Sequence, residues 1–239
     1  MLPEEAWHRP IVRKLFQYYC LHRSERLSKE RILEDLWPDE TPRKATTTFH
    51  TVHSRLRNVL EPYLRARSPS RYFTVEGDVY CFDPYDRVRV DAEHFMQRVR
   101  QALATARQEE LPPMPDDLIA LLVEWQPLLP ALPYEEWLIQ PRETVHQLYI
   151  EGSLYLAHAF LARGLLDEVI LWAERALAQA PWLEEGYQAL MRAHARLDQR
   201  SLALKRYADV RAALERELGA PPSPLTEWLA ERLRRGEEI

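Results

Sequence analysis

The stretch TPRKATTTFHTVHSRLRNVLE, residues 41–61, decides how the first part of this sequence folds. A hydroxyl side chain followed by proline is typical of a helix start, so Thr41 is the predicted N-cap and Pro42 the first helical residue. Apolar side chains then recur at steps of three and four residues, at Ala45, Phe49, Val52, Leu56, Val59 and Leu60. This spacing predicts an amphipathic helix over about 42–61 with one face in a core.

The opposite face of the same helix is polar and cationic. Between residues 43 and 71, seven lysines and arginines stand against one acidic residue, Glu61. Arginine and lysine hold DNA phosphates, and short polar side chains reach base edges in the major groove. The candidate DNA contacts on this helix are Arg43, Lys44, Thr47, His50, Thr51, Ser54, Arg55 and Arg57. The charges alone favour an ordinary solvated helix face, and Arg55 could instead pair with Glu34 or Asp35.

Two further helices precede this one. Apolar residues at helical spacing predict a helix from about Pro10 to His22. A second helix is expected from Ser28 to about Trp37, because Ser28 is a suitable N-cap and Glu30 favours the positive end of the helix dipole. We expect Trp37 to pack under the junction of the second and third helices.

After the third helix, the apolar pattern changes from helical to extended. Residues 71–75 and 79–82 are rich in β-branched and aromatic side chains, and Gly77 between them can adopt a positive φ. The pattern predicts a β-hairpin over 71–82, which must pack on the helices because two strands alone are marginally stable. Arg71 is a further candidate contact to DNA phosphates or the minor groove. Three helices followed by a hairpin is the order of a winged helix-turn-helix.

The rest of the chain is predicted to be helical. Helices are expected over about 91–106, 116–125 and 141–163, with a break at the proline-rich run 111–115 and a short helical turn at 134–138. Gly164 is expected to end the longest of these helices.

An internal repeat follows. Gly164 and Asp198 stand at equivalent turns 34 residues apart, which is the tetratricopeptide period. Ser223 and Pro224 begin a closing helix, which we expect to dock through Leu225, Trp228, Leu229 and Leu233. The other tryptophans of this half are also expected to pack in cores or between helices: Trp125, Trp137, Trp172 and Trp182.

Length and charge fit two domains with different partners. A chain of 239 residues is too long for one small domain, and we place the boundary between residues 86 and 87. Residues 1–90 carry 16 basic and 13 acidic side chains, whereas the remainder carries 16 basic and 24 acidic ones. The net charge of −5 therefore does not exclude a polyanionic partner of the first domain. Neither a membrane span nor a signal peptide is visible, so we expect a cytoplasmic location.

Nothing in the sequence indicates catalysis. The six glycines are scattered singly, so there is no glycine-rich phosphate loop. His50 and His53 lack a cysteine or carboxylate partner at ligand spacing, which argues against zinc. Cys20 and Cys81 have neither metal nor disulfide spacing and are expected as reduced, buried thiols. We expect no enzyme activity, no cofactor and no metal ion.

Several short motifs, in their order and spacing, resemble the SARP-type regulators, the Streptomyces antibiotic regulatory protein family. In the first half they are LEDLWPD at 33–39, Ala45, SRLR at 54–57, Val79-Tyr80, and Val90-Asp91 followed by Phe95. The motifs of the second half resemble the bacterial transcriptional activation domain: LPYEEW at 132–137, Arg142-Glu143, the Gly164 turn, ERELG at 215–219 and PSP at 222–224. The resemblance covers about residues 10 to 235.

This resemblance implies a mainly α protein, with an OmpR/PhoB-type winged helix over 1–86 and a tetratricopeptide-like activation domain over 87–239. It implies a sequence-specific transcription activator that binds double-stranded DNA, with the third helix in the major groove and the hairpin as wing. The helical domain would form oligomers or contact the transcription machinery, RNA polymerase subunits among it. The N-terminal sheet usual in such winged helices has no room here, so the chain is either a shortened variant or a fragment of a larger regulator. The alternative function is a protein–protein scaffold whose winged helix no longer binds DNA.

Overall fold

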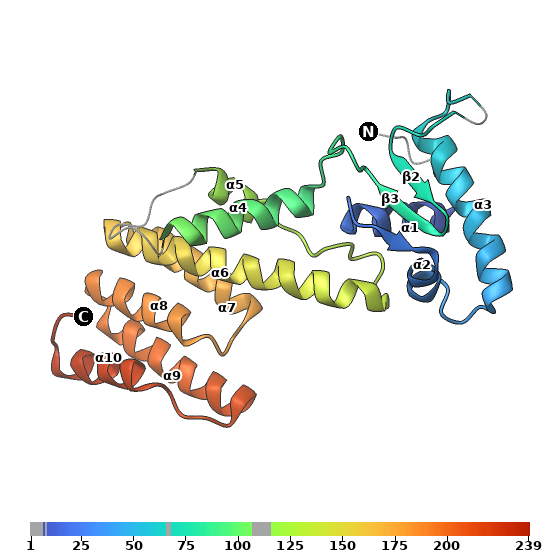
Figure 1. Cartoon of the computed structure of the whole chain (residues 1–239). Helices are drawn as coiled ribbons and strands as arrows, with labels where there is room; N and C mark the ends of the chain where they lie inside the picture. The colour runs from blue at the N-terminus through green and yellow to red at the C-terminus, as the bar shows by residue number, and fades with distance from the viewer. Residues whose placement is uncertain (1–6, 8, 66–67, 107–115) are drawn as a thin grey trace. The chain divides into compact units, whose positions relative to one another are not determined.

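The structure, a computed structural model, describes Trp7 and residues 9–65, 68–106 and 116–239 (Figure 1). The described chain forms two compact units. The first consists of the residues up to His94 together with Tyr134–Pro141, and the second consists of Phe95–Pro133 and Arg142–Ile239. The mainly helical fold class with an N-terminal winged helix is confirmed, while the expected boundary between residues 86 and 87 stays a prediction.

Three helices of the first unit lie close to where the sequence places them: α1 (Pro10–Leu21), α2 (Lys29–Leu36) and α3 (Pro42–Leu60). Ser28 caps α2, because its hydroxyl accepts a hydrogen bond from the Arg31 N–H at 3.2 Å. Thr41 occupies the N-cap position of α3, but its hydroxyl makes no capping hydrogen bond. The start of α3 was therefore predicted correctly and the capping role of its threonine was wrong.

The hairpin belongs to a three-stranded antiparallel sheet. Strands β2 (Phe73–Glu76) and β3 (Val79–Phe82) are joined at Gly77, whose φ of +61° confirms the predicted turn. The first strand, β1 (Leu27–Ser28), pairs with the other edge of β3, so the order is β1-β3-β2. Sequence reasoning missed β1, because two residues are too short to show a periodic pattern.

An aromatic core joins helices and sheet. Phe49 of α3 is fully buried, and its ring meets Tyr80 of β3 edge-on at a centroid distance of 4.9 Å. The Trp37 ring lies 6.3 Å from Phe49, which confirms the expected packing at the junction of α2 and α3. The short helix η2 (Glu136–Leu138) contributes to the same core, since Trp137 packs against it.

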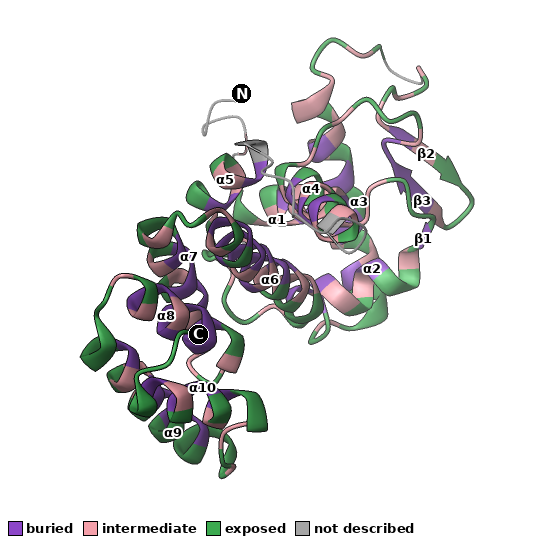
Figure 2. Cartoon of the chain, turned by 90° about the vertical axis from the view of Figure 1, so that its left-hand side faces the viewer, coloured by how far each residue is buried: buried purple, intermediate pink, exposed green. Residues whose placement is uncertain are grey.

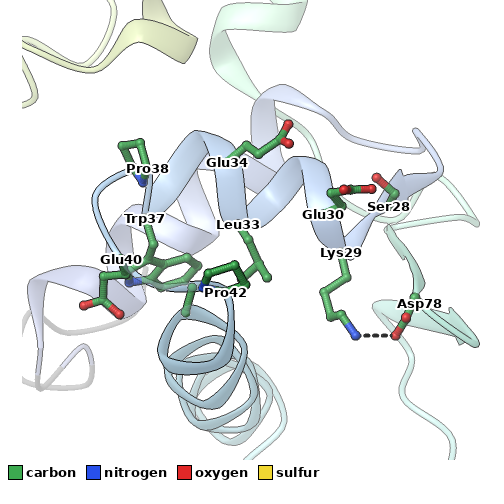
Figure 3. Close-up of a pocket in the computed structure, with 11 residues that line it drawn as sticks. Ser28, Lys29, Glu30, Leu33, Glu34, Trp37, Pro38, Glu40, Pro42 and Asp78 are labelled. Atoms are coloured by element: carbon green, nitrogen blue, oxygen red, sulfur yellow. Dashed lines mark hydrogen bonds and ion pairs between the residues drawn. The ribbon is translucent and has the colours of Figure 1, made fainter.

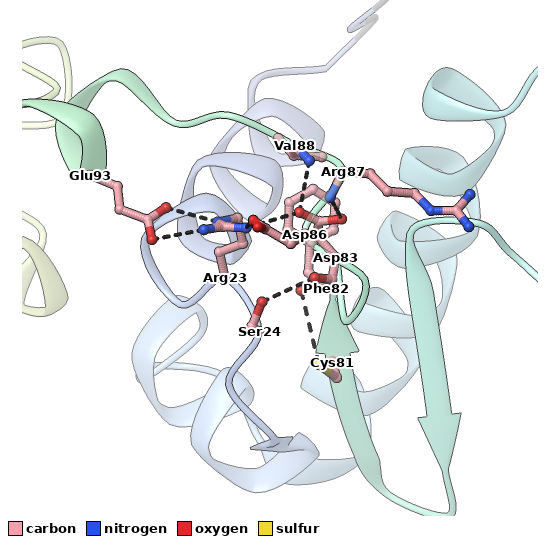
Figure 4. A network of polar contacts seen from close by, with 9 residues as sticks. All are labelled: Arg23, Ser24, Cys81, Phe82, Asp83, Asp86, Arg87, Val88 and Glu93. Atoms are coloured by element: carbon pink, nitrogen blue, oxygen red, sulfur yellow. Dashed lines mark hydrogen bonds and ion pairs between the residues drawn. The ribbon is translucent and has the colours of Figure 1, made fainter. Parts of the chain in front are cut away.

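A polar network fixes the end of the sheet and the start of α4 (Asp91–Ala106). The Arg23 guanidinium donates two hydrogen bonds of 2.8 Å to Glu93 and one of 3.2 Å to Asp83, and it also contacts Asp86 (Figure 4). The Asp83 carboxylate is fully buried and additionally accepts the backbone N–H groups of Arg87 and Val88. Its hydrogen-bond capacity is thus largely satisfied inside the fold.

The second unit is all helical. It contains most of α4 and of α6 (Ile139–Arg163), together with α5 (Asp116–Val123), α7 (Leu166–Gln179), α8 (Glu184–Arg196), α9 (Arg200–Leu218) and α10 (Pro224–Arg235). Helix α6 begins two residues before the predicted Pro141. The predicted break at 111–115 lies outside the described residues. Among the helices that the structure describes, none combines the length and apolar character needed to cross a membrane.

Helices α7, α8 and α9 pack against their neighbours in chain order, and buried residues of α6 and α7 share one core, so the helices form the pairs α6–α7 and α8–α9. Gly164 and Asp198, which end the first helix of each pair, both adopt positive φ, at +72° and +58°. Small residues let the helices approach closely: a Cβ on Gly186 would lie only 2.9 Å from the Leu177 side chain. Figure 2 shows buried positions on the inner faces of these helices and exposed positions outside. The turns after α6 and α8 thus lie 34 residues apart, as the predicted repeat requires.

Two expectations for this unit were wrong. Helix α10 is turned so that Thr226 is buried, where its hydroxyl accepts a 2.9 Å hydrogen bond from Gln188. Leu229 and Leu233 dock as predicted, but Leu225 and Trp228 are about half exposed, and the Arg232 guanidinium covers the Trp228 ring. Trp182 is exposed to a similar extent. Apolar type alone could not reveal that a hydrogen-bonded threonine takes the inward position.

Candidate nucleic-acid interface

The polar face of α3 is the candidate interface. Six of the predicted contacts are exposed on this helix: Arg43, Lys44, Thr47, His50, Thr51 and Ser54. Arg55 and Arg57 are half-buried, and Arg71 is exposed just before β2. Burial of Ala45, Phe49, Val52 and Leu56 on the other side fixes the orientation of the helix. The structure thus keeps eight of the nine predicted residues on one helix and places the ninth next to the hairpin.

The N-terminal end of α3 combines exposed cationic side chains with backbone N–H groups that have no side-chain cap. Its first turn contains no acidic side chain, and Thr41 leaves the first-turn N–H groups without a side-chain cap. Arg43 is exposed, and among the described residues its guanidinium has no ion-pair partner. Lys44 pairs with Glu40 at 3.0 Å but stays mostly exposed. Unsatisfied N–H groups and the helix dipole both favour an anion such as phosphate at this end.

Two threonines of the exposed face are oriented by the helix itself. The Thr47 hydroxyl donates to the Arg43 carbonyl at 3.0 Å, and the Thr51 hydroxyl donates to the Thr47 carbonyl at 3.1 Å. Since the hydroxyl hydrogen is used, each oxygen presents only acceptor lone pairs outward. Such a side chain suits the amino group of adenine or cytosine in the major groove.

The two histidines three residues apart have different environments. His50 is exposed, whereas His53 is 8% exposed and its Nδ1 lies 3.2 Å from the Tyr19 hydroxyl. Burial, with a smaller contribution from Arg57, lowers the pKa of His53 to about 4. His53 is therefore a neutral core residue at physiological pH. Within the described part of the chain, no three histidine, cysteine or acidic side chains are arranged to hold a metal ion.

The two half-buried arginines differ in their partners. Neither Glu34 nor Asp35 pairs with Arg55 in the described structure, because Asp35 instead accepts the Tyr18 hydroxyl at 2.5 Å. Arg57 Nη2 donates to the Ser68 carbonyl at 3.4 Å, and its Nε is buried without a partner. Arg55 thus keeps its charge available, while part of the Arg57 guanidinium is committed to the loop before β2.

A groove of opposite charge lies beside the cationic helix. It encloses about 620 Å³ and runs between α2, the start of α3 and the hairpin turn. Its walls carry Glu30, Glu34 and Glu40, and Lys29 reaches Asp78 across a 2.7 Å ion pair (Figure 3). That hydrogen bond raises the pKa of Lys29. The acidic side chains of this groove therefore border the cationic surface at the start of α3.

The two cysteines show no sign of reactivity in the structure, and three other features were not foreseen from the sequence. Both thiols are free, and burial raises the pKa of Cys20 to about 12, so it is a poor nucleophile. Sequence reasoning missed the Arg23 network, the hydrogen bonds of Glu61 and the packing of Tyr134–Pro141 in the first unit. Only Glu61 gave a signal in the sequence, as the single acid of a cationic stretch.

Known proteins resemble the whole described architecture. The Transcriptional regulatory protein MoaR1 of Mycobacterium tuberculosis is 25% identical over 95% of this chain and 72% of its own length. The Transcriptional regulatory protein EmbR of the same organism is 24% identical over 96% of this chain and 59% of its own length. The solved structure of M. tuberculosis EmbR in complex with a low-affinity phosphopeptide has the same fold, with a TM-score of 0.79 and 23% identity over 97% of this chain and 60% of that one.

The second half also matches a family profile directly. The profile described as Bacterial transcriptional activator domain covers residues 90–234, more than half of the chain. This range includes α4 to α9 and all of α10 except its last residue. The chain belongs to the bacterial transcriptional activator domain family.

Proposed function

We propose that this chain is a sequence-specific transcription activator that binds double-stranded DNA, with α3 in the major groove and the β2–β3 hairpin as wing. The observation that carries the proposal is the exposed face of α3. It joins three features on one surface: an uncapped helix N-terminus, an Arg43 that has no ion-pair partner in the described part of the chain, and Thr47 and Thr51, which present acceptor oxygens. Phosphate contacts would hold the helix in register while the short side chains read base edges.

The similar proteins support regulation of transcription, because MoaR1 and EmbR are named transcriptional regulatory proteins. The chain spans about three fifths of EmbR, so the activity of a whole regulator is part of the proposal. We assign DNA binding to residues 1–86 and protein contacts to residues 87–239. These contacts would be homo-oligomerisation or binding of RNA polymerase subunits in the cytoplasm, and the chain would act by binding and not by catalysis.

Binding to random-sequence duplex DNA over a series of salt concentrations tests the proposal. A DNA-binding helix that neutralises several phosphates loses affinity steeply as salt rises, because bound counterions are released. We expect a log–log slope of about −3 or steeper for the wild-type chain. A chain that shows no salt-dependent binding, and enriches no sequence from a random pool, would instead be a protein–protein scaffold.

A further inference from the structure

The single acidic residue of the cationic stretch sits at the junction of α3 and the hairpin. Glu61 is the C-cap of α3, and its Oε1 accepts the backbone N–H of Arg71 at 2.8 Å. The Ser70 hydroxyl donates to the other carboxylate oxygen. We propose that Glu61 is a positioning residue for DNA binding, which holds Arg71 where its guanidinium reaches a phosphate. The inference rests on the DNA-binding function proposed above.

The hydrogen bonds around Glu61 fix several consecutive residues. The Ser70 oxygen that donates to Glu61 also accepts the N–H groups of Tyr72 and Phe73, each at 3.1 Å. One turn earlier on α3, Arg57 holds the Ser68 carbonyl. Phe73 is buried in the core as the first residue of β2. The backbone from Ser68 to Phe73 is therefore fastened to the end of the recognition helix.

Arg71 lies in the middle of this fastened segment, and its side chain is free to bind. It is exposed, and in the described residues no acid pairs with its guanidinium. Only its backbone is held, through Glu61. An arginine with a fixed backbone loses less conformational entropy on contacting a phosphate than one in a loose loop. The carboxylate thus favours binding through geometry, although its charge repels the DNA.

These two effects have opposite signs, so variants at Glu61 separate them. If Glu61 mattered only as a negative charge, both Glu61→Ala and Glu61→Gln would tighten DNA binding. A positioning role predicts that Glu61→Ala weakens binding by about threefold to fivefold and lowers the salt slope by close to one, as loss of one phosphate contact does. Glu61→Gln keeps an oxygen for the Arg71 N–H and should bind at least as well as wild type.

A double-mutant cycle with Arg71 tests whether Glu61 acts through that residue. Glu61→Ala combined with Arg71→Ala should bind no worse than Arg71→Ala alone. The matched control is Glu61→Ala with Arg43→Ala, at the far end of α3, where the two losses should add. Hydrogen exchange of the Arg71 amide in the full chain provides a second readout, because Glu61→Ala should speed this exchange without changing that of the α1 core amides.

The outcomes are distinct. Weaker binding of Glu61→Ala, recovery in Glu61→Gln and non-additivity with Arg71→Ala support the inference. A wild type with a steep salt slope and a Glu61→Ala variant that binds equally or more tightly overturns it, while leaving the DNA-binding proposal intact. A wild type without salt-dependent binding overturns both. If Glu61→Ala unfolds, Glu61→Asp replaces it, because this variant keeps the charge and shortens the side chain that accepts the Arg71 N–H. Wild-type binding together with unchanged Arg71 amide exchange in Glu61→Asp would overturn the inference.

Discussion

Two sets of cationic side chains in the first unit have opposite surroundings. On the side formed by α1, α2 and the strand ends, the cations are paired: Arg23 with three carboxylates, Lys14 with Glu135, Arg26 with Glu76 and Lys29 with Asp78. On α3 and the approach to the hairpin, Arg43, Arg55, Arg65 and Arg71 have no acidic partner among the described residues. The same residue types therefore serve the fold in one region and remain available to a ligand in the other.

This difference locates the candidate interface better than the charge count does. Residues 1–90 carry 16 basic and 13 acidic side chains, so a count over this sequence indicates only a weak preference for a polyanion. Because the cations of α1, α2 and the strand ends are paired with acids, that side is a poor candidate for binding a polyanion. The exposed cationic surface that remains is on α3. Removing a cation that pairs with a buried acid should therefore change stability, and removing an exposed cation of α3 should change binding.

The largest effect is expected from the paired region, for Arg23→Ala. The change leaves the buried Asp83 carboxylate without its cation and should lower the free energy of unfolding by about 3 kcal/mol. Chemical denaturation measures this loss. The control is Arg26→Ala, which removes the same charge from a well-exposed pair and should leave stability unchanged. If Arg23→Ala also made the affinity for DNA less dependent on salt, the paired cations would take part in DNA binding, and the two regions would not differ in function.

The next effect depends on pH and involves the core side of α3. Burial lowers the pKa of His53 to about 4, from about 6.5 in the unfolded chain. The unfolded state takes up a proton first as pH falls, so stability is complete above pH 6.5 and decreases below it. We expect a loss of about 2 kcal/mol between pH 7.5 and pH 5 from this group alone.

Two variants isolate that contribution. His53→Phe should flatten the pH dependence of unfolding in this window, whereas His50→Asn should keep most of it because the buried imidazole of His53 stays in place. Urea denaturation at several pH values provides the measurement. A profile that His53→Phe does not alter would mean that other groups control acid sensitivity.

A smaller effect is expected for the two exposed cations at the start of α3, of which Lys44 pairs with Glu40 and Arg43 has no acidic partner among the described residues. Replacing Arg43 and Lys44 together with alanine should weaken binding to random duplex DNA about tenfold and reduce the salt slope by about two. The matched control is Arg26→Ala with Arg31→Ala, which removes equal charge from the paired region and should change the slope much less. Equal slopes in the two double variants would show that only total charge matters.

The smallest change in affinity is expected for the residues placed over base edges. Thr47→Ala and His50→Ala should alter overall affinity by less than about twofold, while changing which bases are preferred. Selection of bound sequences from a random pool measures that preference. Identical preferred sites in wild type and both variants would exclude these side chains from base recognition.

Local signals predicted the elements that carry the candidate site. The Thr41-Pro42 pair located the start of α3, apolar spacing gave its buried face, and Gly77 located the hairpin turn. The repeat was visible because Gly164 and Asp198 end corresponding helices in left-handed conformation. Apart from the repeat, which depends on a spacing of 34 residues, each of these signals depends on residues within a few positions of one another.

Features that depend on distant contacts were not predictable in the same way. Arg23 meets partners 60 to 70 residues away, and no local pattern distinguishes it from an exposed arginine. Trp228 and Leu229 are both apolar neighbours on α10, yet only Leu229 is buried, because hydrogen bonds of Thr226 set the rotation of the helix. The contacts of nucleic acid with individual side chains of α3 stay a prediction.

The return of Tyr134–Pro141 to the first unit has a practical consequence for anyone dividing this molecule. Leu138 is fully buried, Trp137 lies edge-on against Tyr18 at 5.2 Å, and Glu135 holds Lys14 at 2.6 Å. The chain therefore crosses between its two units three times. A gene truncated after the hairpin would encode a winged helix with a piece of its hydrophobic interior missing, and a fusion protein built from it would inherit that defect. Each unit is built from two separate segments of the chain.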